Sequence, residues 1–375
     1  MFEQPWFEQP ISLQPRRDFL FKAAAAGLFA ATYSISANAA VPAGMPGRFP
    51  GRVVAVEGAG RSQEEVRLML NRGITNLTGA PSPEEAWRSM FSPGDVVGLK
   101  LNPVGRPFAI SSPEVVRGII EGLRMAGVPA KNIVAYDRYH NEFLAAGFDK
   151  WLPEGVRWTF ASEAYAAHPF QLDMKGYDEA QYVEMPLVFP GADPAVPHHR
   201  RSYLSNFISK DVNKLVNLSV LKHHQSAGVT ISLKNMSHGL VNNVSRSHSS
   251  SSLNTCGSFI PNIVDHPIIR QKAVLQICDG LTAAYHGGPG AKVEHYLWQH
   301  NTMYFATDPV ALDKTGLRAI DAEREKRNML PIATANADKD STFVNMQPEH
   351  IEIAGALGLG TFDDKKIDVR RFKLG

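Results

Sequence analysis

DVVGLKL at residues 95–101 begins a run of three segments, of which the second is SPEVVRGIIEGLRM at 112–125 and the third is NIVAY at 132–136. The outer two are short apolar runs of the kind that buried strands contain. In the middle segment the apolar residues at 115, 116, 119, 120 and 123 share one helical face, and Ser112-Pro113 is a helix start signal. The three segments therefore predict a βαβ unit, which favours parallel strands covered by helices.

Strand-like and helix-like segments alternate on both sides of this unit. Strands are predicted at 52–57, 214–221, 273–278, 302–306 and 367–372, and helices from Ser62, from Ser82, from Asp308-Pro309 to about 327, and at 348–357. The pattern breaks down between 161 and 201, which indicates an insertion or a lobe boundary within 161–210. We expect an α/β fold with mixed or mostly parallel sheets flanked by helices, in two closely packed lobes.

Residues 1–39 have the features of a twin-arginine signal peptide. Arg16-Arg17 precedes Phe19-Leu20, an Ala-rich apolar run covers 23–35, and Ala37-Asn38-Ala39 is a small-x-small cleavage site. The apolar run is shorter than the roughly 20 residues that cross a bilayer. We expect the twin-arginine translocase to export the chain, cleavage near Ala39, and a periplasmic or extracytoplasmic α/β region at 40–375 without a membrane span.

Charge and cysteine content exclude several classes of function. With 39 Lys and Arg against 37 Asp and Glu and no long basic run, the chain is not expected to bind nucleic acid. Cys256 and Cys278 are too few for an iron–sulfur cluster, which usually needs four thiolates. In an oxidising compartment the two cysteines either pair or stay free. The pattern does not predict an oligomeric state.

Histidines concentrate in the middle of the chain. Ten of the 13 lie between His198 and His300. Imidazole is the commonest metal ligand and titrates near neutrality, so this concentration indicates a metal or proton-transfer site. The alternative for any single one is an ordinary surface or core histidine.

One segment places several of these groups at the end of a predicted strand. Lys222, His223 and His224 follow the apolar run 214–221, at the edge where open α/β sheets bind ligands. Within the polar loop expected at 222–256, a second apolar run presents Lys234, Asn235 and His238 before Gly239. Such a set suits an anionic ligand, a metal, or both.

Four further polar residues have a structural and a functional interpretation. Asp279-Gly280 follows the strand at 273–278 and is either a ligand position or a plain turn. Arg246 lies beside His248 in a Ser-rich run. This run either binds phosphate through its hydroxyls and Arg246 or is only a polar loop. Asp308 and Asp313 are explained by helix capping or by a ligand role.

The order of these motifs resembles a known family. Its most specific parts here are Lys222-His223-His224, Lys234-Asn235 and Asp308-Pro309-Val310-Ala311-Leu312-Asp313, within a likeness that extends from about Val53 to the C terminus. The likeness is to domain of unknown function 362. Many members of that family carry ferredoxin-like clusters and some have twin-arginine leaders, and because this chain lacks the cysteines no iron–sulfur cluster is expected. The arrangement more distantly resembles nickel-pincer lactate racemases, in which a lysine tethers the cofactor and histidines serve the metal and the proton transfer.

The leading hypothesis is an exported enzyme that depends on a metal ion or metal-containing cofactor and acts on a small anionic substrate by redox or proton-abstraction chemistry. The predicted roles are catalytic for His224, Lys234 and His248; substrate-binding for Lys222, Asn235, Asp279 and Arg246; and metal-binding for His223, His224, His238 and His248. The alternatives are a non-catalytic periplasmic metal- or anion-binding protein and an accessory partner of an exported enzyme.

Overall fold

The computed structural model of the chain describes residues 32–33, 44–165, 171–248, 253–334, 343 and 345–374. Apart from the two-residue strand β1 (Thr32–Tyr33), the predicted signal peptide at 1–39 lies outside these residues. No helix in the described ranges is long and apolar enough to cross a membrane.

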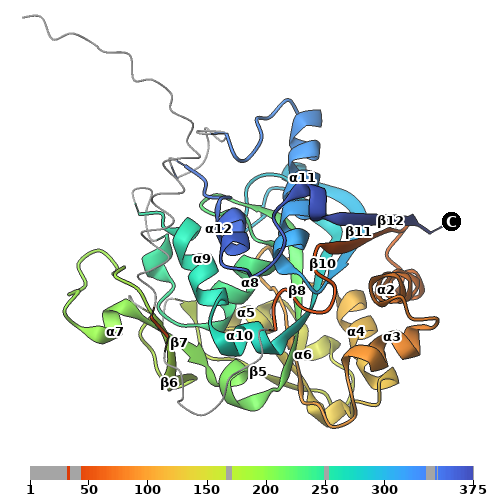
Figure 1. Cartoon of the computed structure of the whole chain (residues 1–375), viewed down its shortest axis with the longest axis horizontal. Coiled ribbons are helices and arrows are strands. Elements are labelled where there is room, and N and C mark those ends of the chain that lie inside the picture. Colours follow the sequence, from red (N-terminus) through yellow and green to blue (C-terminus); the bar gives the residue numbers. More distant parts are fainter. Residues whose placement is uncertain are drawn as a thin grey trace, which may run out of the picture.

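A large, mostly parallel sheet organises the described part of the chain (Figure 1). Its strands are β2 (Arg52–Glu57), β3 (Val97–Lys100), β4 (Ile133–Tyr136), β5 (Arg157–Thr159), β8 (Lys214–His224), β9 (Gly228–Val229), β10 (Ala273–Ala284), β11 (Leu297–Ala306) and β12 (Asp368–Lys373). They follow the order β12-β2-β11-β10-β8-β3-β4-β5, and the short β9 pairs with β8. Along that path only β11 runs antiparallel to its neighbours. The predicted α/β fold with a mostly parallel sheet is confirmed.

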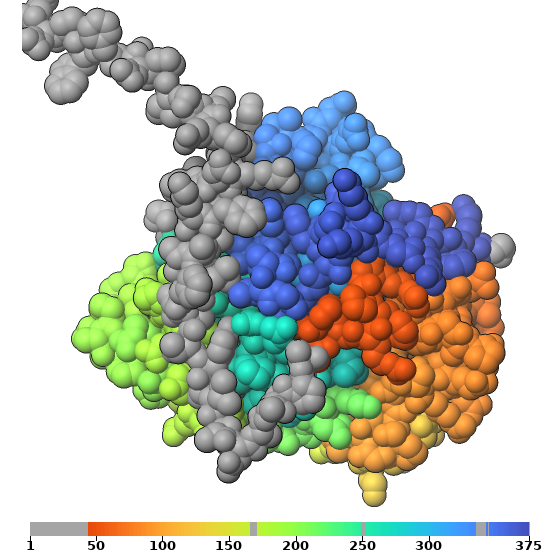
Figure 2. All heavy atoms as spheres, in the orientation of Figure 1, coloured from red at the N-terminus to blue at the C-terminus, as the bar shows by residue number. Residues whose placement is uncertain are grey.

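Helices cover both faces of this sheet. They are α2 (Gln63–Thr78), α3 (Pro83–Met90), α4 (Pro113–Met125), α5 (His140–Ala145) and α6 (Phe148–Trp151), then α8 (Ile231–Leu240), α9 (Cys256–Val264), α10 (Pro267–Lys272), α11 (Pro309–Lys326) and α12 (His350–Ala356). The short helix α7 (Pro197–Arg200) lies beside the small second sheet instead (Figure 1). Side chains alternate along a strand, so Val54 and Val56 pack into the core under α2–α6, whereas Val53 and Ala55 pack into the core under α8–α12. In Figure 2 the segment from residue 44 (red) lies between the C-terminal residues (blue) and the first helices (orange).

A small second sheet occupies the region in which the sequence pattern breaks down. Strands β6 (Tyr177–Glu184) and β7 (Arg201–Ser205) pair antiparallel, and β1 pairs with β6. Strand β3 precedes this region and β8 follows it, yet these two strands are direct neighbours in the large sheet. The region is therefore an insertion that leaves the large sheet continuous, and it lies at one end of the molecule in Figure 1.

The prediction of a polar loop at 222–256 is wrong for its first part. Strand β8 continues to His224, and residues 231–240 form α8. Nearly all of α8 is buried, so its apolar residues do not mark a single face. Strand β10 likewise passes through Asp279-Gly280 to Ala284, with a register shift against β11 at that point. These two residues therefore lie inside a strand rather than in a turn. Cys256 and Cys278 are both buried and free.

Candidate functional site

A cavity of about 360 Å³ opens at the carboxyl ends of three neighbouring strands. Lys100 ends β3, Asp137 follows β4 and His224 ends β8, while α8 covers the cavity from the other side. The lining residues are Lys100, Asn102, Pro103, Val104, Asp137, Arg138, Tyr139, Glu142, Tyr165, Lys222, His224, Thr230, Lys234, Asn235, His238, Gly239, Val244, Ser245, His248 and Pro289. Parallel α/β sheets bind their ligands at this edge.

Helix α8 is held in place by a carboxylate from α11. The two oxygens of Asp313 accept hydrogen bonds from the backbone N–H groups of Ser232 at 2.7 Å and Leu233 at 2.9 Å, in the first turn of α8. Those N–H groups have no partner within the helix. Burial raises the pKa of Asp313 to about 8, and the two hydrogen bonds oppose that rise. Asp313 therefore positions the residues that α8 contributes to the cavity.

One end of the cavity contains a buried ion pair. The Lys100 ammonium lies 2.6 Å from the Asp137 carboxylate, and both side chains are buried. Burial lowers the pKa of Lys100, whereas Asp137 raises it. The amide oxygen of Asn235 accepts from Lys100 at 3.3 Å and from Asn102 at 3.0 Å. Lys100 is therefore fully engaged within the protein.

Two more cations of the cavity are also engaged. Lys222 donates to the Asn102 side-chain oxygen at 2.7 Å, to the Val104 carbonyl, and to the Ala109 carbonyl at 3.3 Å. These three acceptors match the three protons of an ammonium, so Lys222 anchors the 102–109 loop. Burial, followed by Lys234 and Lys100, lowers the pKa of Lys222 to about 7. The Arg138 guanidinium donates to two carbonyls of the α8 end and to the Gln171 side chain.

Lys234 differs from these three cations. It is buried, and its ammonium makes no hydrogen bond or ion pair with any residue in the described ranges. Burial lowers the pKa of Lys234 to about 8, with Cys256 opposing and Arg138 adding to the shift. An ammonium that faces a partly enclosed cavity without a protein acceptor favours an anionic ligand there.

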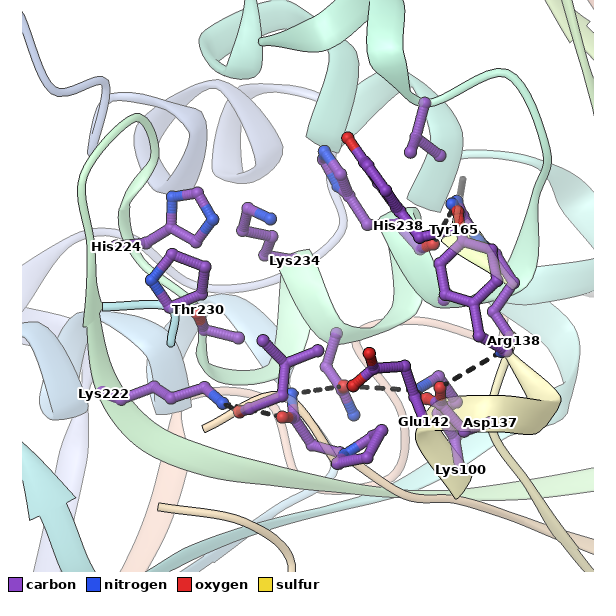
Figure 3. Close-up of a pocket in the computed structure, with 18 of the residues that line it drawn as sticks. Lys100, Asp137, Arg138, Glu142, Tyr165, Lys222, His224, Thr230, Lys234 and His238 are labelled. Carbon is purple, nitrogen blue, oxygen red and sulfur yellow. Dashed lines mark hydrogen bonds and ion pairs between the residues drawn. The ribbon is translucent and has the colours of Figure 1, made fainter. Parts of the chain in front are cut away.

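Beside Lys234, His224 presents a hydrogen-bond donor whose position is fixed. Its Nδ1 accepts hydrogen bonds from the backbone N–H groups of Ser226 at 3.1 Å and Ala227 at 3.3 Å. A neutral ring that accepts at Nδ1 carries its proton on Nε2. Burial, followed by Lys234 and His248, lowers the pKa of His224 well below its usual range. Nε2 is buried and has no partner among the described residues, and Figure 3 shows His224 beside Lys234 at one end of the cavity.

His238 and His248 flank a serine hydroxyl. Ser247 Oγ lies 2.9 Å from His238 Nε2 and 2.6 Å from His248 Nδ1. Burial, followed by Lys234, lowers the pKa of both imidazoles well below the usual range, so both rings are neutral near pH 7. The Cys256 thiol joins the pair, because a ligating atom of each residue lies within 4.8 Å of the others. Burial raises the pKa of this thiol, and Lys234 is the largest opposing influence.

The structure gathers five of the predicted side chains around the cavity with Lys222, namely His224, Lys234, Asn235, His238 and His248. Three others do not line it. His223 points to the opposite side of β8 from its neighbours Lys222 and His224, because successive strand residues face opposite ways. Its Nδ1 accepts from the Gly288 N–H at 3.2 Å and its Nε2 lies 3.2 Å from the Met346 sulfur.

Arg246 and Asp279 likewise bind backbone groups away from the cavity. Buried Arg246 donates to the carbonyls of Leu187 at 3.0 Å and Arg200, and to Ser202 Oγ at 2.8 Å. Arg246 lies in the short 3-10 helix η4 (Ser245–Ser247) and connects it to the small sheet. Asp279 accepts from the backbone N–H groups of Ser112 at 2.8 Å and Leu281 at 3.0 Å, at the start of α4.

Several residues that line the cavity are not among those predicted from the sequence. Asp137 and Arg138 directly follow the predicted strand at 132–136, and the rule that ligands bind at carboxyl ends of parallel strands was a sufficient signal for them. Glu142 and Tyr165 had no comparable signal. The sequence suggests only a cluster or a disulfide for Cys256, because its approach to His238 and His248 depends on how α9 packs.

Comparison with known proteins places the cavity within a known protein family. No curated protein matches the chain. A model of the family described as domain of unknown function (DUF362) matches residues 97–318, from the start of β3 into α11. This match covers more than half of the chain and includes every residue that lines the cavity. The chain therefore belongs to the DUF362 family.

Proposed function

We propose that this protein is an enzyme that acts on a small anionic substrate, held in the cavity by the Lys234 ammonium and the Nε2–H of His224. A metal ion or metal-containing cofactor at the cavity histidines is part of the proposal, as is export to the periplasm. The chemistry that these groups suit is proton abstraction beside a carboxylate, or redox chemistry.

The pairing of two unsatisfied donors supports the binding step. Both side chains line the same cavity and neither has an acceptor among the described residues, whereas Lys100 and Lys222 already have theirs. His224 Nε2 is fully enclosed, and Lys234 Nζ keeps accessible surface toward the cavity. A carboxylate offers two oxygens and accepts from both donors at once. Binding of an anion thus compensates a buried charge that the protein leaves unpaired.

The same two groups are suited to moving a proton. With a pKa of about 8, part of the Lys234 population is neutral near pH 7 and has a lone pair on Nζ. In the proposed step the neutral form of Lys234 acts as the base and no longer holds the carboxylate as an ammonium. Its Nζ takes the proton from the carbon next to the carboxylate, the C–H electron pair becomes a C=C bond, and the C=O π pair moves onto a carboxylate oxygen. The Nε2–H of His224 donates to that oxygen and the ring stays neutral, because its Nδ1 is occupied by backbone N–H groups.

Deuterium exchange tests the reaction. Mature protein is incubated in D₂O with a panel of 2-hydroxy and 2-amino acids, and proton NMR follows the signal of the hydrogen on the second carbon. We expect the signal of at least one compound to decay with wild-type protein and to persist with Lys234→Met. The exposed Lys366 provides the control, since Lys366→Met should leave the rate unchanged. Equal exchange in all three proteins contradicts the proposal.

Calorimetric titration of lactate and phosphate separates binding from turnover. Lys234→Met should weaken anion binding by at least about tenfold, the equivalent of 1.4 kcal/mol. It should also be as stable as wild type, because it removes an unpaired buried charge. Binding without exchange supports the non-catalytic anion-binding protein. Binding of neither probe by wild-type protein favours the accessory partner of an exported enzyme.

Export is tested on the full-length chain. Replacement of Arg16 and Arg17 by lysine should retain the protein in the cytoplasm of a bacterial host, whereas the wild-type leader delivers it to the periplasm. Cell fractionation with a reporter fusion measures the outcome. Periplasmic delivery of both versions contradicts the twin-arginine route.

A further inference from the structure

Three potential metal-binding side chains from different elements meet at the back of the cavity. His238 lies on α8, His248 follows the turn at 245–247, and Cys256 is the first residue of α9. One ligating atom from each lies within 4.8 Å of the other two. The rings of His238 and His248 have their centroids 5.0 Å apart, at an interplanar angle of 63°.

The two imidazoles aim nitrogens at one point. Ser247 Oγ lies 2.9 Å from His238 Nε2 and 2.6 Å from His248 Nδ1, and its own proton reaches the Val244 carbonyl at 2.7 Å. A hydroxyl has one proton, so with that proton on Val244 its oxygen accepts an N–H from both rings. The hydroxyl thus marks the point toward which one nitrogen of each ring is directed, and these two nitrogens are the potential metal ligands. Metal ligation therefore needs each neutral ring to carry its proton on the other nitrogen. For His238 that nitrogen, Nδ1, lies 2.9 Å from Ser237 Oγ, whereas the backbone N–H groups at His224 Nδ1 prevent the same change.

The surrounding hydrogen bonds hold the ligands in this arrangement. The other ring nitrogen of His238, Nδ1, is 2.9 Å from Ser237 Oγ, which orients the ring in the way that outer partners orient metal-binding histidines. The backbone N–H of Thr255 donates to the Ser247 carbonyl at 2.7 Å and ties the start of α9 to the histidine segment. Burial favours the protonated thiol of Cys256, whereas its place at the N-terminus of α9 and the nearby Lys234 ammonium oppose that effect, so a metal ion would bind with loss of the thiol proton.

We infer that His238, His248 and Cys256 form a site for one metal ion of the Zn²⁺ or Co²⁺ class, with a fourth position open to the cavity. Two imidazoles and a thiolate are the ligand types that these ions prefer, and three protein ligands with one open position is the arrangement of catalytic zinc sites. His238 and His248 line the cavity, whereas Cys256 does not, so the thiol closes the site from behind. For the ion to enter, the Ser247 hydroxyl turns out of the space between the rings.

This assignment changes the predicted ligand set. Cys256 replaces His224, whose Nδ1 is occupied by backbone N–H groups and whose Nε2 therefore bears a proton. His223 is excluded because it faces the other side of β8. The inference deepens the proposed function by naming the metal ligands, and the metal site can be measured without any substrate.

Cobalt titration of metal-free mature protein tests the site. We expect one Co²⁺ per chain and a thiolate-to-cobalt charge-transfer band in the near ultraviolet, with elemental analysis confirming the stoichiometry. Cys256→Ser should abolish the band, and His248→Ala should weaken cobalt binding by more than the roughly tenfold typical of losing an outer partner. Cys278 provides the matched control, since it is an equally buried free thiol in β10, and Cys278→Ala should keep the band.

A second measurement uses the wild-type protein only and so does not depend on whether the variants fold. Saturating Zn²⁺ should protect Cys256 from alkylation during mild denaturant treatment, as read by mass spectrometry of its peptide, and should not protect Cys278. A cobalt spectrum without a thiolate band, a band that survives Cys256→Ser, or equal alkylation of Cys256 with and without Zn²⁺ overturns the inference. Lys234→Met should still bind Co²⁺, so loss of anion binding and loss of the metal site are separate outcomes.

Discussion

At the scale of single residues, Asp308 is buried at the start of α11 and accepts three backbone hydrogen bonds. Its donors are the N–H groups of Gly51 at 2.9 Å, Ala311 at 2.9 Å and Thr361 at 2.8 Å. Asp313 binds two N–H groups of α8 in the same manner. The Asp-Pro-Val-Ala-Leu-Asp string therefore serves the fold, since buried N–H groups need acceptors.

The ion pair of Lys100 and Asp137 gives the first prediction. Asp137→Ala leaves the Lys100 ammonium buried without its carboxylate, which should lower the free energy of unfolding by about 3–5 kcal/mol in urea titrations. Asp364 provides the comparison, because it pairs with Lys314 and Arg318 while more than half exposed. Asp364→Ala should cost less than about 1 kcal/mol. An equal decrease in the free energy of unfolding in the two variants would show that the buried ion pair contributes no more to stability than the exposed one.

Arg246 gives a second prediction at this scale. Arg246→Leu removes the donor of several buried carbonyls, each of which costs about 1–3 kcal/mol when left unsatisfied. We expect a clear drop in thermal stability and, in folded protein, unchanged phosphate affinity by calorimetry. A variant of normal stability that no longer binds phosphate would instead restore the substrate-binding role predicted from the sequence.

At the scale of elements, α8 is the part of the fold on which the cavity depends most. It supplies Lys234, Asn235 and His238, and almost all of its ten residues are buried. Its first residue, Ile231, has a φ of 31°, which lies in the left-handed region that a β-branched residue rarely adopts. The neighbouring hydrogen bonds to Asp313 hold the helix start against this strain.

The third prediction concerns this helix start. Asp313→Ala should lower the free energy of unfolding by about 2–4 kcal/mol and also weaken anion binding, because α8 loses its anchor. The control lies on the same helix, where Asp321 accepts from the Ile332 N–H at 2.8 Å and does not touch α8. Asp321→Ala should lower stability without changing anion affinity in calorimetry. If both variants keep wild-type affinity, Asp313 does not position the site.

At the scale of the whole molecule, burial keeps several histidines neutral. Burial alone lowers the pKa of His266 from 6.5 to about 4. The ring accepts the Ile268 N–H at 3.3 Å through Nδ1 at the start of α10. Because the folded-state pKa lies below the unfolded value, the unfolded chain takes up a proton first as the pH falls. The contribution to stability is thus complete above pH 6.5 and is lost progressively down to about pH 4.

The fourth prediction follows from this difference. Between pH 7 and pH 5, protonation of the unfolded chain at His266 should lower the free energy of unfolding by about 2 kcal/mol. His266→Asn keeps a side-chain oxygen for the Ile268 N–H and has no titrating ring. Urea titrations at pH 7, 6 and 5 should therefore give a smaller pH dependence for the variant. An identical pH dependence in both proteins would assign the acid sensitivity to other groups.

Local pattern predicted much of the fold correctly. The βαβ unit appears as β3, α4 and β4, and the helix predicted from Asp308 to about residue 327 appears as α11, with the Asp308 side chain capping it. Helix α8 was missed, because burial on nearly all sides removes the periodicity that marks a half-exposed helix. The ends of β8 and β10 were placed too early, since polar residues interrupt their apolar runs.

The sequence by itself determined the α/β class, the capping of α11, and the strand end at which Lys222 and His224 lie. Strand alternation would also have placed His223 on the other face. Only the tertiary structure decided which polar groups already have partners. Lys222 has acceptors and Asp279 has backbone donors, whereas the Lys234 ammonium has no acceptor in the described ranges. It alone brings Cys256 to His238 and His248. The physical reason is that spacing along the chain sets local geometry, whereas burial and hydrogen-bond satisfaction depend on segments that pack together only in the folded molecule.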